Sequence, residues 1–476
     1  MSDSKLNRRR FLQIAAFSGI GAVLAACGGE AAPSTPAGSG GAAAPTAAAS
    51  GGAAAAPTAA AASSGGAAAG SVKELTILWA QWDPSNYLQQ LVKDYQGVAG
   101  VDVKVVQEPW GTFGDRFFTE MAAKGTAWDM VVGDSQWLGA GSTGGHYVDL
   151  TDFLNKDNLK DHFVPATLKY YSEYGGKYWA VPMEGDANGW AYRKDWFEDP
   201  KEMAAFKAKY GYDLAVPKDL KQLRDIAEFF TRPEENRYGL ALYTQTAYDA
   251  LAMGVEQTIF SYGGDLGDYT TNKVDGILNS PQNVEALQLY HDLYKFTPPN
   301  WGQSFFLEDN QAFTEGLAAM TMNFFAFFPA LANPATNPHA ADTGYFANPA
   351  GPTGQQHAAL GGQGISIVSY SKNKDEAMKF LEWFSRDDVQ KKWADVGGYT
   401  TNKAVLESEE FRKATPYNEA FYQSMQGVKD FWAIPSYADL LTQMNDRIHP
   451  FVVDDKGTAQ EALDGLAQDW NKTLGN

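Results

Sequence analysis

The chain has 476 residues, a formal net charge of −19 at pH 7 and 13% aromatic residues. So acidic a chain is poorly suited to nucleic acid, because phosphate contacts need clustered Lys and Arg, and an anionic membrane surface should repel it. With one cysteine, Cys27, it can form no intramolecular disulfide. We therefore expect a monomer with no nucleic-acid partner.

Residues 1–26 read as an export signal. Three arginines, Arg8 to Arg10, precede an apolar run that ends at Leu24 and is too short to span a membrane stably. The order from Arg8 to Gln13 resembles a twin-arginine signal, although Asn7 and Gln13 depart from the usual form. The pattern predicts export, with the route left open.

Residues 24–27, Leu-Ala-Ala-Cys, resemble the bacterial lipobox, in which the cysteine becomes the lipidated N-terminus. Residues 28–71 contain little besides Ala, Gly, Ser, Pro and Thr, which cannot bury enough apolar area to fold. A flexible chain of that length spans roughly 35–40 Å on average. We therefore predict lipidation of Cys27, a disordered tether over 27–71, and a protein anchored to the outer face of the cell membrane.

From Val72 onward about 400 residues remain, which is too many for one hydrophobic core and suits two lobes. Short apolar runs at 75–79, 101–106 and 128–132 predict buried strands, and helices are expected to begin near Asp83-Pro84 and near Thr112. Alternation of strand and helix predicts a parallel sheet that binds ligands at its carboxyl edge. A second set of strands at 238–243 and 318–323 comes with helices at 217–231, 246–261 and 280–295.

Several segments in order resemble the family 1 extracellular solute-binding proteins, which include the sugar-binding components of ABC importers. They are the segments 128–134, 176–182, 190–197, 262–264, 318–323, 361–367 and 374–381. The resemblance covers nearly all of 72–476. It implies an α/β fold of the periplasmic-binding-protein type, with two lobes that are each a sheet flanked by helices and that are hinged by crossing segments.

The same resemblance implies how the chain divides and what it does. Lobe 1 would comprise 72–183 and 359–402, and lobe 2 would comprise 184–358 and 403–476. Closure of the hinge around a carbohydrate would present the solute to the permease subunits of an ABC transporter. We expect no enzyme activity and no cofactor, and the choice among sugars and polyols depends on hydrogen-bond geometry that one sequence does not supply.

Candidate ligand residues stand where strands end or where the lobes join. A sugar offers hydroxyls and a patch of C–H bonds, so a site should pair aromatic faces with Asp, Asn, Gln or Glu. The first and third strands are followed by Trp79, Gln81, Trp82 and Asp83, and by Asp134 and Trp137. Asp83 could instead cap the helix that starts at Pro84, and Asp134 could shape a turn.

Further candidates come from the crossings and from the second half. Glu184 and Asp186 follow Pro182; as two nearby carboxylates they also allow a general acid and base, although solvated or hydrogen-bonded partners are commoner. The glycines at 361–364 suit close backbone approach to a ligand better than a phosphate cradle. The remaining candidates are Tyr243, Gln245, Asn323, Gly362, Gln363, Tyr399 and Trp432, the last as a stacking platform in a loop.

Motifs for other chemistry are absent from the sequence. The six histidines show no paired metal-ligand spacing, and no Gly-x-Ser-x-Gly elbow occurs. Two alternatives stay open: a secreted glycoside hydrolase lipoprotein, and a metal-binding relative of the same fold that would use tyrosines such as Tyr170 and Tyr171. Packing is the better reading of that tyrosine pair, so no metal site is predicted.

Overall fold

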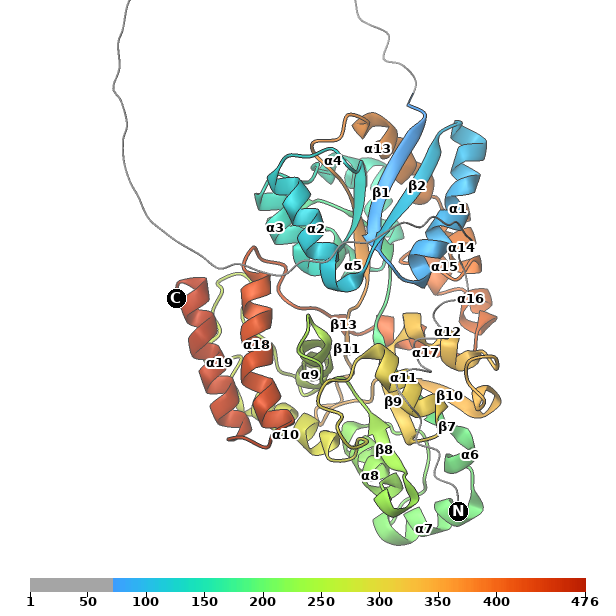
Figure 1. The fold of residues 1–476 in the computed structure, drawn as a ribbon, viewed down its shortest axis with the longest axis vertical. Helices are drawn as coiled ribbons and strands as arrows, with labels where there is room; N and C mark the ends of the chain where they lie inside the picture. The colour runs from blue at the N-terminus through green and yellow to red at the C-terminus, as the bar shows by residue number, and fades with distance from the viewer. Residues whose placement is uncertain (1–71) are drawn as a thin grey trace, which may run out of the picture. The chain divides into compact units, whose positions relative to one another are not determined.

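The computed structural model describes residues 72–476 (Figure 1). The predicted export signal over 1–26, the lipidation of Cys27 and the tether over 27–71 lie outside the described residues. Within 72–476, no helix is both long and apolar enough to cross a membrane.

Sheet 1 has five strands in the order β2-β1-β3-β12-β6. The strands are β1 (Glu74–Ala80), β2 (Asp102–Glu108), β3 (Met130–Asp134), β6 (Val181–Glu184) and β12 (Gln363–Ile367). Strand β1 pairs in parallel with β2 and with β3, as the alternating pattern predicts. Strand β12 runs antiparallel to β3 and to β6, so the sheet as a whole is mixed.

Helices cover sheet 1 on both sides, because each connection between parallel strands must cross a face of the sheet. Helix α1 packs on β2, α2 on β1 and α13 on β12, while α14 lies against α1. These elements define lobe 1 (Figure 1). Its helices and minor strands are α1 (Asp83–Ala99), α2 (Trp110–Ala122), η2 (Ser135–Trp137), α3 (Leu138–Thr143), α4 (Thr151–Asn155), η3 (Lys156–His162), α5 (Pro165–Tyr171), β4 (Glu173–Tyr174), β5 (Lys177–Tyr178), α13 (Lys374–Phe384) and α14 (Asp387–Asp395).

Sheet 2 has four strands in the order β10-β7-β9-β8. They are β7 (Asn188–Arg193), β8 (Tyr238–Ala241), β9 (Ala318–Phe324) and β10 (Thr343–Ala347). Strand β9 is buried along its whole length, and it pairs antiparallel with β7 and parallel with β8. A central strand covered on both faces is mostly apolar, and in β9 the polar Thr321 and Asn323 are buried along with the alanines and methionines.

The elements around sheet 2 define lobe 2. Helix α8 packs on β8, α11 on β9 and α17 on β10, and the pair α18 and α19 packs against α10. Their bounds are α6 (Lys194–Phe197), α7 (Pro200–Tyr210), α8 (Leu220–Phe230), η4 (Pro233–Glu235), α9 (Ala250–Ser261), α10 (Pro281–Tyr294), α11 (Phe306–Thr314), η5 (Phe325–Phe327), α12 (Pro329–Ala332), η6 (Ala340–Asp342), α17 (Asn418–Met425), α18 (Tyr437–Val452) and α19 (Ala459–Leu474).

The chain passes between the sheets more than once. Strand β6 belongs to sheet 1 and the next strand, β7, to sheet 2, so residues 185–187 form one crossing. On the way from β10 back to β12, β11 (Ala358–Ala359) pairs in parallel with β13 (Val428–Lys429). After α13 and α14 of lobe 1, helices α15 (Lys403–Leu406) and α16 (Glu409–Ala414) connect the chain to α17 of lobe 2. The lobe limits given above from the sequence stay a prediction.

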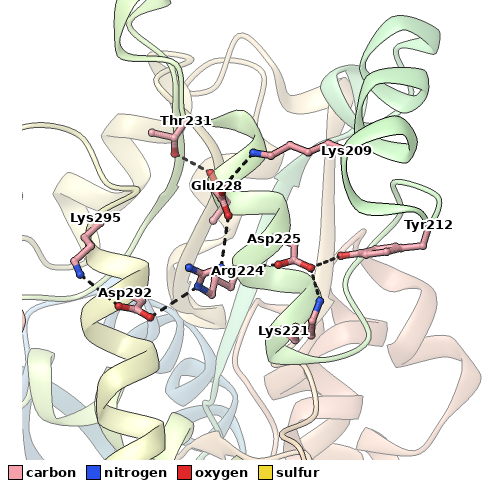
Figure 2. Close-up of polar contacts among 10 residues, drawn as sticks. Lys209, Tyr212, Lys221, Arg224, Asp225, Glu228, Thr231, Asp292 and Lys295 are labelled. Atoms are coloured by element: carbon pink, nitrogen blue, oxygen red, sulfur yellow. Dashed lines mark hydrogen bonds and ion pairs between the residues drawn. The ribbon is translucent and has the colours of Figure 1, made fainter.

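A network of charged side chains ties α8 to its neighbours in lobe 2 (Figure 2). The guanidinium of Arg224 lies 3.5 Å from Glu228 on the same helix and 3.9 Å from Asp292 on α10. Lys209 of α7 lies 3.2 Å from Glu228. Such exposed pairs contribute about 0–1 kcal/mol each, so the network orients helices more than it stabilises them.

Candidate functional site

A cavity of about 790 Å³ is lined by residues of both lobes. From lobe 1 come the ends of β1 and β3 and the start of α2; from lobe 2 come the segment before α9, the start of α11, the end of β9 and helix α18. The lining residues are Trp82, Trp110, Gly111, Phe113, Gly114, Asp115, Phe118, Asp134, Trp137, Ala140, Asp186, Gln245, Thr246, Ala247, Tyr248, Asp249, Phe305, Phe306, Phe324, Phe327, Leu360, Gly361, Pro435, Tyr437, Ala438, Leu441, Thr442, Asn445 and Asp446.

Aromatic rings from both lobes meet along one wall of the cavity. The ring of Trp82 contacts the ring of Trp110 edge to face, with 5.4 Å between the ring centroids. Its centroid lies 6.4 Å from that of the Phe327 ring of lobe 2. Phe327 in turn stacks on Phe306 at 4.2 Å. Apolar ring faces of this kind suit the C–H patches of a sugar or polyol.

Asp134 reaches across the cavity to lobe 2. It is the last residue of β3, and its Oδ2 accepts a hydrogen bond from the Tyr248 hydroxyl at 2.7 Å. Tyr248 has φ of 65°, a left-handed conformation that bulky residues rarely adopt. The side-chain amide of Asn445 donates to the Tyr248 carbonyl oxygen at 2.7 Å, which holds this segment in place.

Two cavity carboxyl groups from opposite lobes interact with each other. Asp249 precedes α9 in lobe 2, and burial together with the charge of Asp134 raises the pKa of its carboxyl well above the ordinary value. Burial also raises the pKa of Asp134, against the hydrogen bonds from Tyr248 and Ser135 that favour its ionised form. Both groups line the cavity, yet the surrounding protein removes much of their hydration.

Asp186 lies at the crossing between β6 and β7. The backbone N–H groups of Ala187 and Ala326 donate to its carboxylate at 2.8 and 3.3 Å. Burial outweighs these bonds and raises the pKa of Asp186 to about 8. Its neighbour Glu184 is fully buried, and burial and the charge of Asp186 raise the pKa of Glu184 well above its ordinary value.

Six residues predicted from the sequence line the cavity: Trp82, Asp134, Trp137, Asp186, Gln245 and Gly361. Asp134 and Trp137 follow a parallel strand, and Asp186 lies where the lobes join, as the sequence argument requires. Glu184 does not line the cavity: its Oε2 accepts from the Tyr399 N–H at 3.3 Å. The geometry therefore does not bring Glu184 and Asp186 together around a reacting group.

Of the candidates after β1, Trp82 lines the cavity, whereas Trp79, Gln81 and Asp83 do not. Trp79 is fully buried and donates its indole N–H to the side-chain oxygen of Gln363, which is also buried. Gln81 and Asp83 are exposed elsewhere. Asp83 is the first residue of α1 rather than its cap, and the Ser85 hydroxyl donates to the Trp82 carbonyl there at 2.7 Å.

Two strand-end candidates of lobe 2 hydrogen-bond to each other in the core. The Tyr243 hydroxyl donates to Asn323 Oδ1 at 2.5 Å, and the Asn323 amide donates to Asn310 Oδ1 at 2.8 Å. Both residues have no exposed surface. Their polarity is thus satisfied inside the protein rather than by a ligand.

Trp432 was expected to stack on the ligand, but the structure places it in the core. It is 1% exposed, and its ring lies 5.8 Å from that of Trp470 and 5.0 Å from that of Tyr269. Tyr399 lines a different cavity of about 540 Å³ among α14 to α17. Neither residue lines the cavity that the two lobes share.

The sequence predicts that the glycines after β11 let a ligand approach the backbone closely. The structure shows a different cause for glycine at these positions. A Cβ at Gly362 would lie 2.0 Å from the Tyr171 hydroxyl and 2.1 Å from the Glu184 carbonyl oxygen. At Gly361, which does line the cavity, a Cβ would lie 2.3 Å from the Phe324 ring. Close packing of protein atoms therefore requires glycine at both positions.

Several cavity residues were not singled out from the sequence. Trp110 follows β2 and could have been found by applying the strand-end argument to that strand. Tyr248, Asp249 and Asn445 come from a loop and from helix α18, and no local pattern marks them as cavity residues. Among residues 72–476, no group of three or more His, Cys, Asp or Glu is placed to hold a metal ion.

Comparison with known proteins identifies the class to which this fold and cavity belong. Residues 79–391 match the family described as bacterial extracellular solute-binding protein, and the chain belongs to this family. Members of this family bind solutes outside the cytoplasm, and the two-lobed α/β architecture is thereby confirmed.

Individual relatives are distant. A probable ABC transporter-binding protein of Deinococcus radiodurans is 27% identical over 311 residues, which are 64% of this chain and 69% of that protein. A maltotriose-binding protein of Pyrococcus abyssi is 23% identical over 377 residues, 76% of this chain and 73% of that protein. The structure of a solute-binding protein from Agrobacterium radiobacter K84 with ribitol is similar at a TM-score of 0.71 and 24% identity, covering 84% and 98% of the two chains.

Proposed function

We propose that the protein captures a sugar or polyol in the cavity between its lobes and delivers it to an ABC importer without transforming it. The observation that carries this proposal is the cavity itself, in which aromatic rings and carboxyl groups from both lobes converge. Maltotriose and ribitol, the solutes named for two of the similar proteins, are both rich in hydroxyls.

The lining residues offer a sugar both kinds of contact that it needs. The rings of Trp82, Trp110 and Phe327 present apolar faces to C–H groups, while Asp134 and Gln245 can exchange hydrogen bonds with hydroxyls. Trp137 lines the same space, and its indole N–H has no hydrogen-bond partner among residues 72–476. A hydroxyl oxygen of the solute could accept from it after a small movement of the ring.

Ligand capture would close the two lobes on each other. Because the cavity wall is shared by both lobes, a solute that contacts Trp82 in lobe 1 and Phe327 in lobe 2 gains both contacts only when the lobes are close. Differential affinity for the closed arrangement is what lets a ligand drive the change. The closed arrangement is then the form that the membrane permease subunits would recognise.

The N-terminal sequence supports a location of the protein at the cell membrane. An export signal over 1–26 followed by the lipobox ending at Cys27 would anchor the protein to the outer face of the cell membrane through a lipid. The tether would keep the binding lobes near the permease while they collect solute. We propose that the protein acts as a monomer.

The experiment that tests this function is a thermal-shift screen of the purified protein against sugars, oligosaccharides and polyols. A solute that binds the native state must raise the melting temperature by mass action. Small-angle scattering of the protein with the best solute should then show a smaller radius of gyration than without it. A library in which no carbohydrate or polyol raises the melting temperature would overturn the proposal, and turnover of a glycoside would replace it with hydrolysis.

A further inference from the structure

The cavity between the lobes is lined by acidic side chains and by no basic side chain. Five aspartates line it, namely Asp115, Asp134, Asp186, Asp249 and Asp446, and the lining contains no Lys, Arg or His. None of these aspartates forms an ion pair with a residue in the described part of the chain, whose pairs involve other acidic residues. A cation that enters the cavity would therefore meet carboxyl groups that no basic side chain of the described residues has paired.

The basic residues next to these aspartates in the sequence are directed elsewhere. Arg116 follows Asp115 but pairs with Glu108 at 3.6 Å, and its guanidinium lies over the ring of Trp128. Arg447 follows Asp446 but pairs with Asp469 of α19 at 2.6 Å. Local cations thus neutralise charges outside the cavity and leave the aspartates within it unpaired.

Asp134 and Asp249 are the pair most affected by this lack of positive charge. They come from opposite lobes, at the end of β3 and before α9, and line the same cavity. The raised pKa values of both carboxyls agree with that geometry. A neutral hydroxyl can donate a hydrogen bond to one of them, whereas an ammonium group between them would also remove their repulsion.

The rest of the lining suits a cation as well. Ring faces carry a negative quadrupole that attracts positive charge, and the cavity has tryptophan and phenylalanine rings from both lobes. Asn445 lines the cavity and is 3% exposed, yet its Oδ1 has no hydrogen-bond partner among the described residues. That oxygen is a buried acceptor that no donor of the described residues satisfies.

Building on the proposed function, we propose that the solute is an amine-bearing sugar or polyol whose ammonium group is held between Asp134 and Asp249. The remaining hydroxyls would use the aromatic wall and Gln245. Solutes with a carboxylate or phosphate would be rejected, since the lining offers them no cation and several like charges.

The test is calorimetric titration of the purified protein with matched solutes that differ in one group. The series compares glucose, glucosamine and N-acetylglucosamine, then the corresponding disaccharides, and sorbitol with its 1-amino derivative. N-acetylglucosamine keeps the nitrogen and adds bulk but has no charge, so it separates charge from shape. We expect the amine to bind at least tenfold more tightly than its neutral partner in every scaffold that binds at all.

Variants locate the effect. Asp134→Asn and Asp249→Asn should each reduce the ratio of amine affinity to neutral affinity toward one, whatever they do to neutral binding. Asp439→Asn, an exposed change on α18 that does not line the cavity, should leave the ratio as it was. Thermal melts of the variants show whether a lower ratio of amine affinity to neutral affinity results from unfolding. If Asp134→Asn does not fold, Asp249→Asn alone tests the proposal.

The outcomes separate the two proposals. Neutral carbohydrates that bind as tightly as their amines would overturn the amine proposal and leave the proposed function standing. An amine preference that persists in both variants would also overturn it. Failure of every member of the series and of the wider carbohydrate library would overturn the proposed function, and the amine proposal with it.

Discussion

Two tryptophans should respond in opposite ways to truncation, because one lines the cavity and the other is packed in the core. Trp82 has its ring 5.4 Å from Trp110 and 6.4 Å from Phe327, on the aromatic wall. Aromatic truncations at the centre of a binding site cost about 2–4 kcal/mol of binding free energy. Trp82→Ala should therefore weaken solute binding by about thirty-fold to several-hundred-fold.

Trp432→Ala should act on stability instead. The ring is 1% exposed and contacts Trp470 at 5.8 Å, so its removal leaves a hole in the core. Buried Trp→Ala changes cost about 3–5 kcal/mol of the free energy of unfolding. The Trp432 N–H has no hydrogen-bond partner among residues 72–476, so no hydrogen bond is lost and the lower end of that range is expected.

The assay is the same for both variants: calorimetric titration with the solute found in the screen, and a thermal melt of each free protein. Trp82→Ala should show the larger loss of affinity, and Trp432→Ala the larger fall in melting temperature. Affinity lost in Trp432→Ala without a fall in melting temperature would refute the placement of that ring in the core. Unchanged affinity in Trp82→Ala would remove the aromatic wall from the binding site.

Three further outcomes follow from particular groups. Cys27→Ser should abolish incorporation of a labelled fatty acid in a bacterium that processes lipoproteins, and persistent labelling would contradict the anchor. In the folded protein the pKa of Asp186 is about 8, so Asp186 binds its proton more tightly than in the unfolded chain. The free energy of unfolding should therefore fall as the pH rises from about 4 to 8. Asp186→Asn should make the melting temperature depend less on pH over that range. Asp225→Ala on α8 leaves the Tyr212 hydroxyl, now 3.0 Å from Asp225, without its acceptor and should cost about 1–3 kcal/mol of unfolding free energy (Figure 2). Lys221→Gln removes the ion pair with Asp225 and the contact of the ammonium with the Tyr212 ring, both made by an exposed side chain, and should cost clearly less; equal losses would refute the distinction.

Local sequence patterns predict the elements of the fold better than their pairing. The run at 75–79 lies within β1, the run at 101–106 begins one residue before β2, and the run at 128–132 is shifted by two residues from β3. The antiparallel place of β12 between β3 and β6 was not predicted. Its partners lie far away in the sequence, and an apolar run specifies burial rather than the direction of a neighbouring strand.

Polar residues at strand ends line the cavity in some cases, such as Asp134 in sheet 1 and Gln245 after β8 in sheet 2, but not in all. Tyr243 also follows a strand, yet Asn323 accepts its hydrogen bond inside the core. For Trp432, the surrounding loop suggested exposure, but Trp470 of α19 covers it. Burial by a distant helix leaves no mark in the local sequence.

The carboxyl groups of the cavity differ in what a ligand must displace. Asp186 already accepts from two backbone N–H groups, that of Ala187 within the crossing and that of Ala326 after β9, so its first effect is to join the crossing to lobe 2. Asp134 would have to exchange its bond from Tyr248 for one from the solute, which reduces the net gain.

Asp249 accepts no side-chain hydrogen bond and forms no ion pair within residues 72–476, and it lies beside a like charge. A donor from the solute would therefore gain most at Asp249, where it satisfies a carboxyl group without breaking an existing bond. Because Asp249 belongs to lobe 2 while Asp134 belongs to lobe 1, a donor shared by both favours the same approach of the lobes that the aromatic wall favours. Recognition of the solute and closure around it would then depend on the same pair of groups.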